Sequence, residues 1–83
     1  MGKDNIQLTI VSPEKTLFEG DVRYVQLPGV NGSFSVLYEH APLLSALEAG
    51  EIKFKSAGVT HKIPVKSGFV SVGDNQVSIC IEQ

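Results

Sequence analysis

The sequence lacks most of the features that mark an enzyme, a metalloprotein or a membrane span. It has 83 residues, a single cysteine (Cys80) and no tryptophan. One cysteine cannot form an internal disulfide, and metal sites built on cysteine need several. The longest apolar runs fall far below the ~20 residues that span a bilayer. We therefore expect one small domain over residues 1–83 that works through its surface.

An excess of charge of one sign is also absent. Seven Lys and Arg stand against nine Asp and Glu, which gives a formal net charge of -2. Binding to a nucleic acid through its phosphates needs clustered Lys and Arg. The lysines of the second half instead alternate with apolar residues, which is typical of a solvated strand face. The sequence therefore predicts no nucleic-acid partner.

Candidate catalytic and metal-binding groups are few. His40 has serines near it in sequence, but no strand-turn-helix nucleophile elbow accompanies it. His61 lies between Thr60 and Lys62 in an alternating strand, so we expect it to face solvent. The two histidines and the scattered carboxylates show none of the spacings of zinc or calcium sites. We predict no catalytic residue, no metal and no cofactor, and a small hydrolase that uses His40 with a serine stays as an alternative.

Alternation of apolar and polar residues dominates the chain and predicts an all-β fold. Successive side chains of a strand point to opposite faces of its sheet, so this period of two indicates half-buried strands. Short turn signals separate the runs. The strongest is 28–32, and 56–58 and 73–75 are among the others; their Asn and Gly tolerate positive φ. Pro64 predicts an edge strand or a bulge, and Cys80 is expected to point outward on the last strand. Residues 43–48 fit one helical turn or a strand. The alternating runs are 6–10, 24–27, 33–36, 51–55 and 76–82.

A set of motifs in collinear order resembles one known family. The most specific is a Gly-x-x-Gly-x-hydrophobic hairpin at residues 29–34, followed by His-Ala-Pro-Leu-Leu at 40–44. Together the motifs resemble the N-terminal domain of the epsilon subunit of rotary ATP synthases, which is called delta in mitochondria. Where that family often has an acidic residue on the hairpin, this sequence has Ser33. The other matching motifs are Val-x-Ser-Pro-Glu at 10–14, Phe-x-Gly at 18–20, the strand start at 49–52, and the closing pattern at 67–77.

The resemblance implies a ten-stranded β-sandwich of two five-stranded sheets and a function without catalysis. The chain would belong to the central stalk of a proton-transporting ATP synthase, on the cytoplasmic side of the bacterial inner membrane, and would touch the membrane only through the complex. It would couple the gamma subunit to the ring of c subunits and be a monomer in isolation. By resemblance, the rotor-ring contacts are Asn31, Gly32 and Ser33, and the gamma contacts are Ser12, His40, Pro42, Leu43 and Ser45.

Two alternatives remain open at this stage. A stand-alone β-sandwich binding or adaptor module would show the same alternation and turns. Typical epsilon subunits continue into a two-helix hairpin that regulates ATP hydrolysis, whereas this sequence stops at Gln83. We expect either a protein without the inhibitory hairpin or a sandwich trimmed from a longer chain.

Overall fold

The structure is a computed structural model that describes residues 5–83, and these residues form nine strands. Each strand is five to seven residues long, and short turns connect most of them. None of the described residues forms a helix long and apolar enough to cross a membrane. The strands are β1 (Ile6–Val11), β2 (Thr16–Val22), β3 (Tyr24–Gly29), β4 (Gly32–Leu37), β5 (Leu43–Leu47), β6 (Gly50–Ser56), β7 (Val59–Val65), β8 (Ser67–Gly73) and β9 (Gln76–Glu82).

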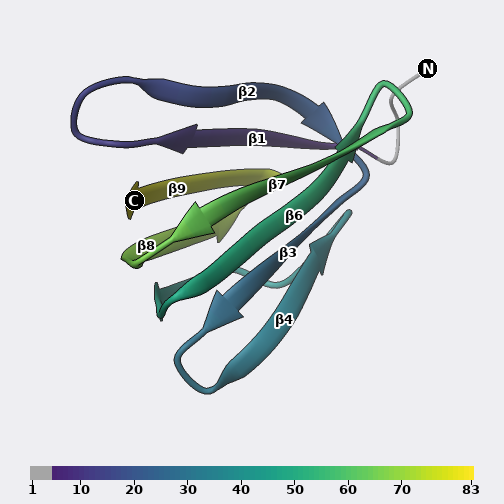
Figure 1. Ribbon diagram of the computed structural model, residues 1–83. Coiled ribbons are helices and arrows are strands. Elements are labelled where there is room, and N and C mark those ends of the chain that lie inside the picture. Colours follow the sequence, from purple (N-terminus) through teal and green to yellow (C-terminus); the bar gives the residue numbers. More distant parts are fainter. Residues whose placement is uncertain (1–4) are drawn as a thin grey trace.

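The strands follow one hydrogen-bonded order, β2-β1-β9-β8-β5-β3-β6-β7, and β4 pairs with β3. All pairs are antiparallel except β1 with β9, which run parallel. Figure 1 shows β1 and β2 at the top of the molecule and β3 and β4 at the bottom. The sheet curls, so that β2 contacts β6 although the two are far apart in the hydrogen-bonding order.

One apolar core fills the inside of this curl. The side chains that alternate inward come from both ends of the strand order, and none of the buried residues within 5–83 is polar or charged. Phe18 of β2 packs on Phe54 of β6 with ring centroids 4.4 Å apart, which closes the curl where its two ends meet. The buried residues are Ile6, Leu8, Ile10, Val22, Val25, Leu27, Val36, Leu47, Ile52, Phe54, Val65, Val70, Val72, Val77, Ile79 and Ile81.

Two tight turns confirm the turn chemistry expected from the sequence. Asp74 and Asn75 both have positive φ, and the residues that flank them, Gly73 and Gln76, are paired. The turn between β6 and β7 likewise has positive φ at both of its central positions, residues 57 and 58. Positive φ at both central residues is what a two-residue hairpin needs to match the twist of its strands. The predicted hairpin at 29–32 also forms, since Gly29 pairs with Gly32.

The structure confirms the all-β class, while the finer arrangement differs from the expectation. The described residues form nine strands in one curled sheet, not ten strands in two five-stranded sheets. The strands β2, β1, β9, β8 and β5 form one layer of the curl, and β3, β4, β6 and β7 form the other. The two layers belong to one sheet because β3 pairs with β5, through the single pair Gly29–Leu47. Residues 43–47 form a strand and not a helical turn, and Pro64 lies on β7, which ends the strand order as an edge.

The predicted solvent-facing position of His61 is wrong. Its ring is half-buried and stacks on that of Phe54, with centroids 4.9 Å apart and planes 5° apart. His61 pairs with Phe54 across β6 and β7, and cross-strand partners point to the same face of a sheet. The polar neighbours Thr60 and Lys62 were misleading, because they occupy the outer face of the same strand.

Candidate docking surface

The outer face of β5, β8, β9 and β1 carries no charged side chain in its two central rows. The register aligns these rows across the four strands. Along each strand, the residues of these rows alternate with residues that point into the core. Leu44 and Phe69 are the most exposed apolar residues here, at 78% and 65%. The next strand beyond β1 is β2, and it has a charged residue in this row, because Glu19 pairs with Thr9. We call this surface the β5–β1 face, and its residues are Leu44, Ser71, Ser78, Thr9, Ala46, Phe69, Cys80 and Val11.

This composition is that of a docking surface. Monomeric proteins rarely expose contiguous apolar patches larger than a few hundred Å², and the centres of interfaces are depleted in charge. Cys80 is exposed near the middle of the face, which confirms the outward direction predicted for it. The small Ala and Ser side chains around Phe69 let a partner approach the strands closely.

The polar side chains of His40, Ser12 and Ser45 lie within hydrogen-bond distance of backbone carbonyl oxygens. His40 Nδ1 lies 2.7 Å from the carbonyl oxygen of its neighbour Ala41. The hydroxyls of Ser12 and Ser45 donate to backbone carbonyls, at 3.3 Å and 3.2 Å. No group of three His, Cys, Asp or Glu within residues 5–83 is placed to hold a metal ion.

The predicted gamma contacts do not gather at one point. Ser12 follows β1 at one end of the β5–β1 face, next to the row that contains Gly68. His40 precedes β5 at the opposite end, where Leu43 pairs with Val72. The two residues therefore bracket the face, and its centre lies between them.

The other three predicted gamma contacts lie beside β5. Leu43 and Ser45 alternate with the outward-facing Leu44, so both are on the core side of the strand. Leu43 packs against the core, and Ser45 is half-buried. Pro42 is exposed just before the strand. Within β5, the residues that present side chains outward are Leu44 and Ala46, one position away from the predicted Leu43 and Ser45.

The corner at His40 is held by hydrogen bonds to two other parts of the chain. The backbone N–H of Glu39, which has a φ of 63°, donates to Asn75 Oδ1 at 2.6 Å. The N–H of His40 donates to the carbonyl oxygen of Leu37 at 3.1 Å. The connection between β4 and β5 is thus tied to the turn between β8 and β9, which fixes His40 relative to the β5–β1 face.

The predicted rotor-ring contacts form the exposed tip of the β3–β4 hairpin. Asn31, Gly32 and Ser33 are all exposed. Two hydrogen bonds tie the β3 side of the hairpin to residues 46–48, because Val30 N–H donates to the Ala46 carbonyl at 3.3 Å and Glu48 N–H donates to the Pro28 carbonyl at 2.8 Å. The tip is therefore a firm projection.

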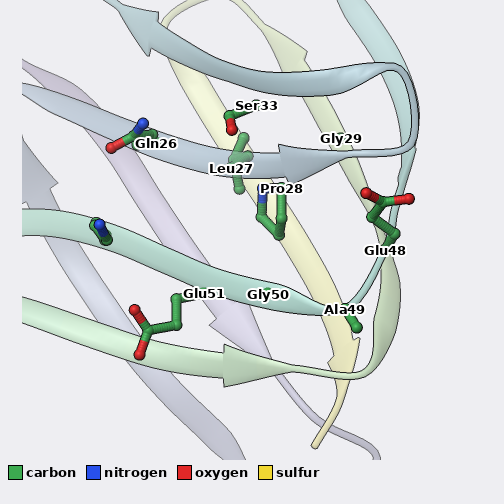
Figure 2. Close-up of a pocket in the computed structure, with 10 residues that line it drawn as sticks. Gln26, Leu27, Pro28, Gly29, Ser33, Glu48, Ala49, Gly50 and Glu51 are labelled. Carbon is green, nitrogen blue, oxygen red and sulfur yellow. The ribbon is translucent and has the colours of Figure 1, made fainter.

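A shallow polar depression of about 360 Å³ lies beside this hairpin. Figure 2 shows Pro28 in its middle, with Glu48 and Glu51 around it and Ser33 across from them. Pro28 packs against Gly50 so closely that a Cβ at residue 50 would lie 2.8 Å from Pro28 Cβ. Lys53 also lines the depression, so its charges are mixed and favour no single kind of ion.

Sequence reasoning missed the centre of the β5–β1 face. Leu44, Phe69 and Cys80 were not among the gamma contacts that the family resemblance implies. The available signal was Phe69 itself, because it is an aromatic residue that shares the polar side of its strand with Ser67 and Ser71.

Comparison with known proteins identifies the family of the chain. Residues 5–83 match the family model described as ATP synthase, Delta/Epsilon chain, beta-sandwich domain. A curated relative, the ATP synthase epsilon chain of Nitratidesulfovibrio vulgaris, is 42% identical over 78 residues, which cover 94% of this chain and 58% of the relative. The chain thus spans less than two thirds of that relative's length. The epsilon chain of Caulobacter vibrioides is 36% identical over 77 residues, covering 93% of this chain and 90% of the relative.

Two solved structures share the fold. A chain of the Euglena gracilis mitochondrial ATP synthase, in a structure of its OSCP, F1 and c-ring, has a TM-score of 0.87 and 21% identity, covering 95% of this chain and 51% of that one. A chain from the central stalk and c-ring of the Tetrahymena thermophila mitochondrial ATP synthase has a TM-score of 0.81 and 19% identity, covering 100% and 67%. The family match and the curated relatives lead to one conclusion: this chain belongs to the family of ATP synthase delta/epsilon chains, whose beta-sandwich domain it contains.

Proposed function

We propose that this chain is a non-catalytic part of the central stalk of a proton-transporting ATP synthase. It binds the gamma subunit and the ring of c subunits, and transmits torque between them. The observation that carries the proposal is the uncharged β5–β1 face on a domain of the delta/epsilon family. The solved chains that share its fold come from assemblies with a central stalk or a c-ring, which supports these partners.

The gamma subunit is the occupant assigned to the β5–β1 face. A rotor element must stay bound while load passes through it, which favours a broad, dry contact over scattered surface ion pairs. The face offers exposed Leu44 and Phe69 on a backbone that is paired on both sides in β8 and β9. Ser12 and His40 would then contact gamma at the two ends of the face, while Pro42, Leu43 and Ser45 would support β5 from behind.

The c-subunit ring is the occupant assigned to the hairpin tip at Asn31, Gly32 and Ser33. These residues project from anchored strands, and they lie outside the two rows of the β5–β1 face. Two partners can therefore bind at once. The packed core beneath both sites resists deformation, as torque transfer requires.

We extend the proposal to the location of the chain in the cell and to the division of its strands into two sheets. As part of this complex the chain would be peripheral, on the cytoplasmic side of a bacterial inner membrane, and the bacterial relatives support that setting. The two sheets would separate between β3 and β5, because these neighbouring strands are joined by the single pair Gly29–Leu47. Ten strands, in two sheets of five, would need one strand more than the nine described.

His40→Asp is expected to weaken binding to the cognate gamma subunit about tenfold, because a carboxylate would be desolvated at the end of the interface without a partner. Titration calorimetry with the purified gamma subunit measures this. The domain should stay folded, since His40 lies in a connection and not in the core.

Thr60→Asp is the matched control, because Thr60 is exposed on β7 away from both proposed contact surfaces. It should bind gamma as the unmodified chain does. An affinity of His40→Asp equal to that of the control would remove His40 from the contact. Failure of the unmodified chain to bind gamma at all would reject the proposed function.

A further inference from the structure

Phe69 is the one large side chain in its row of the β5–β1 face. Its cross-strand partners are Ala46 on β5 and Cys80 on β9, both of them small. Phe69 is 65% exposed, so its ring stands above these neighbours with little lateral support. An exposed phenyl ring on a strand leaves apolar area in water that a partner can bury.

A hollow lies on each side of this ring. One, of about 270 Å³, is lined by Leu44, Ser71, Ser78 and Cys80 among others. The second, of about 490 Å³, is lined by residues that include Ala46, Gly68, Pro13 and the exposed Glu82. Phe69 and Cys80 line both hollows, so the Phe69 ring forms a ridge between them.

The backbone under the ridge is fixed by close packing. A Cβ at Gly68 would collide with the carbonyl oxygen of Cys80 and would lie 2.9 Å from Ile81 Cγ2. Only glycine allows β8 and β9 to approach this closely at the residue next to Phe69. The ring therefore projects from a rigid base, and little ordering entropy of the backbone is lost when a partner binds it.

We propose that Phe69 determines which gamma subunit this chain accepts: the ring enters a recess on gamma, and apolar gamma side chains fill the hollow on each side of it. This inference rests on the proposed function, and it adds the shape that the partner must have. Central aromatic residues in well-packed surroundings provide most of the binding energy in many interfaces. A partner without the recess would meet the ring as a steric obstacle, which gives specificity as well as affinity.

The first test is Phe69→Thr, measured by titration calorimetry with the cognate gamma subunit. Threonine is a good strand former, so the substitution removes the ring while β8 keeps its propensity. We expect affinity to fall at least about thirtyfold. The control Val59→Thr replaces a similarly exposed apolar side chain (56%) on β7, away from this face and from the His40 corner, and should leave the affinity within about twofold.

The second test separates shape from general apolar attraction. Ser71→Leu places a larger apolar side chain in the first hollow while Phe69 stays in place. If gamma side chains fill that hollow, the affinity should fall about tenfold or more, although apolar area has been added. A surface that binds by hydrophobicity alone would bind gamma more tightly after this change.

The outcomes distinguish this inference from the function beneath it. If the unmodified chain binds gamma and Phe69→Thr binds within about twofold of it, Phe69 is not the anchor and the proposed function stands. Tighter binding by Ser71→Leu would overturn the fit of gamma into the hollow. If sedimentation shows that the chain alone forms a dimer which Phe69→Thr abolishes, the occupant is a second copy of the chain and the assignment to gamma is wrong. If no gamma binding occurs with the unmodified chain, the proposed function fails together with this inference.

Discussion

Phe54→Ala should lower the free energy of unfolding by about 3–5 kcal/mol, the range for deletion of a buried phenylalanine side chain. Phe54 is fully buried on β6, and its ring contacts those of Phe18 and His61 where the curled sheet closes. Its removal therefore leaves a cavity between β2, β6 and β7. Small domains have about 5–15 kcal/mol of stability in total, so the variant should lose a large share of its stability. Urea denaturation followed by circular dichroism measures the change.

Phe69→Ala is the matched control, because it removes the same atoms from an exposed position. It should cost no more than about 1 kcal/mol, most of it from the lower strand propensity of alanine. A similar loss of stability in both variants would mean that the interior is not where the burial pattern places it. A loss below about 1 kcal/mol for Phe54→Ala would contradict the closure of the curl by the aromatic cluster.

Ser78→Asp should abolish most of the binding to gamma, with a loss of at least about 100-fold. Ser78 is exposed on β9 between Thr9 and Ser71, at the centre of the β5–β1 face. In the free chain the new carboxylate stays hydrated, so the fold should not change. In the complex it would be buried without a cation on this face to pair with, which costs several kcal/mol.

Ser35→Asp provides the control for added charge. Ser35 is also an exposed serine in a strand, but it lies on β4, outside the proposed gamma surface and the hairpin tip. Its affinity for gamma should match that of the unmodified chain. Equal losses in the two variants would point to a general effect of negative charge and would contradict docking through the β5–β1 face.

The local features of this fold could be predicted from the sequence. Alternation predicted β1, β3, β4, β6 and β9 and their buried sides, and Asn and Gly predicted the tight turns, because both signals depend on residues close together in the chain. Pro64 correctly predicted an edge strand, since a residue without an N–H cannot donate to a second neighbour. His61 was misplaced because the alternation in β7 is weak: its inner side holds a histidine, and its outer side holds Pro64.

The docking surface could not be predicted in the same way. It exists because β9 pairs in parallel with β1 and antiparallel with β8, which brings Thr9, Ser78 and Ser71 into one row. Alternation shows which residues share a side of one strand, but it does not show which strands become neighbours or in what register. The resemblance to a family supplied contacts near β5, and the structure places the exposed apolar centre at Leu44 and Phe69.

The most direct test of the account is the rate at which a maleimide alkylates Cys80, with and without the cognate gamma subunit. Cys80 is the single cysteine of the chain, and it is exposed on the β5–β1 face beside Phe69, so it reports on this surface alone. With a cysteine-free gamma subunit at about ten times its Kd, roughly nine tenths of the chain is bound. We predict that the alkylation rate then falls about tenfold. An unchanged rate, under conditions where calorimetry shows gamma to be bound, would contradict docking through this face.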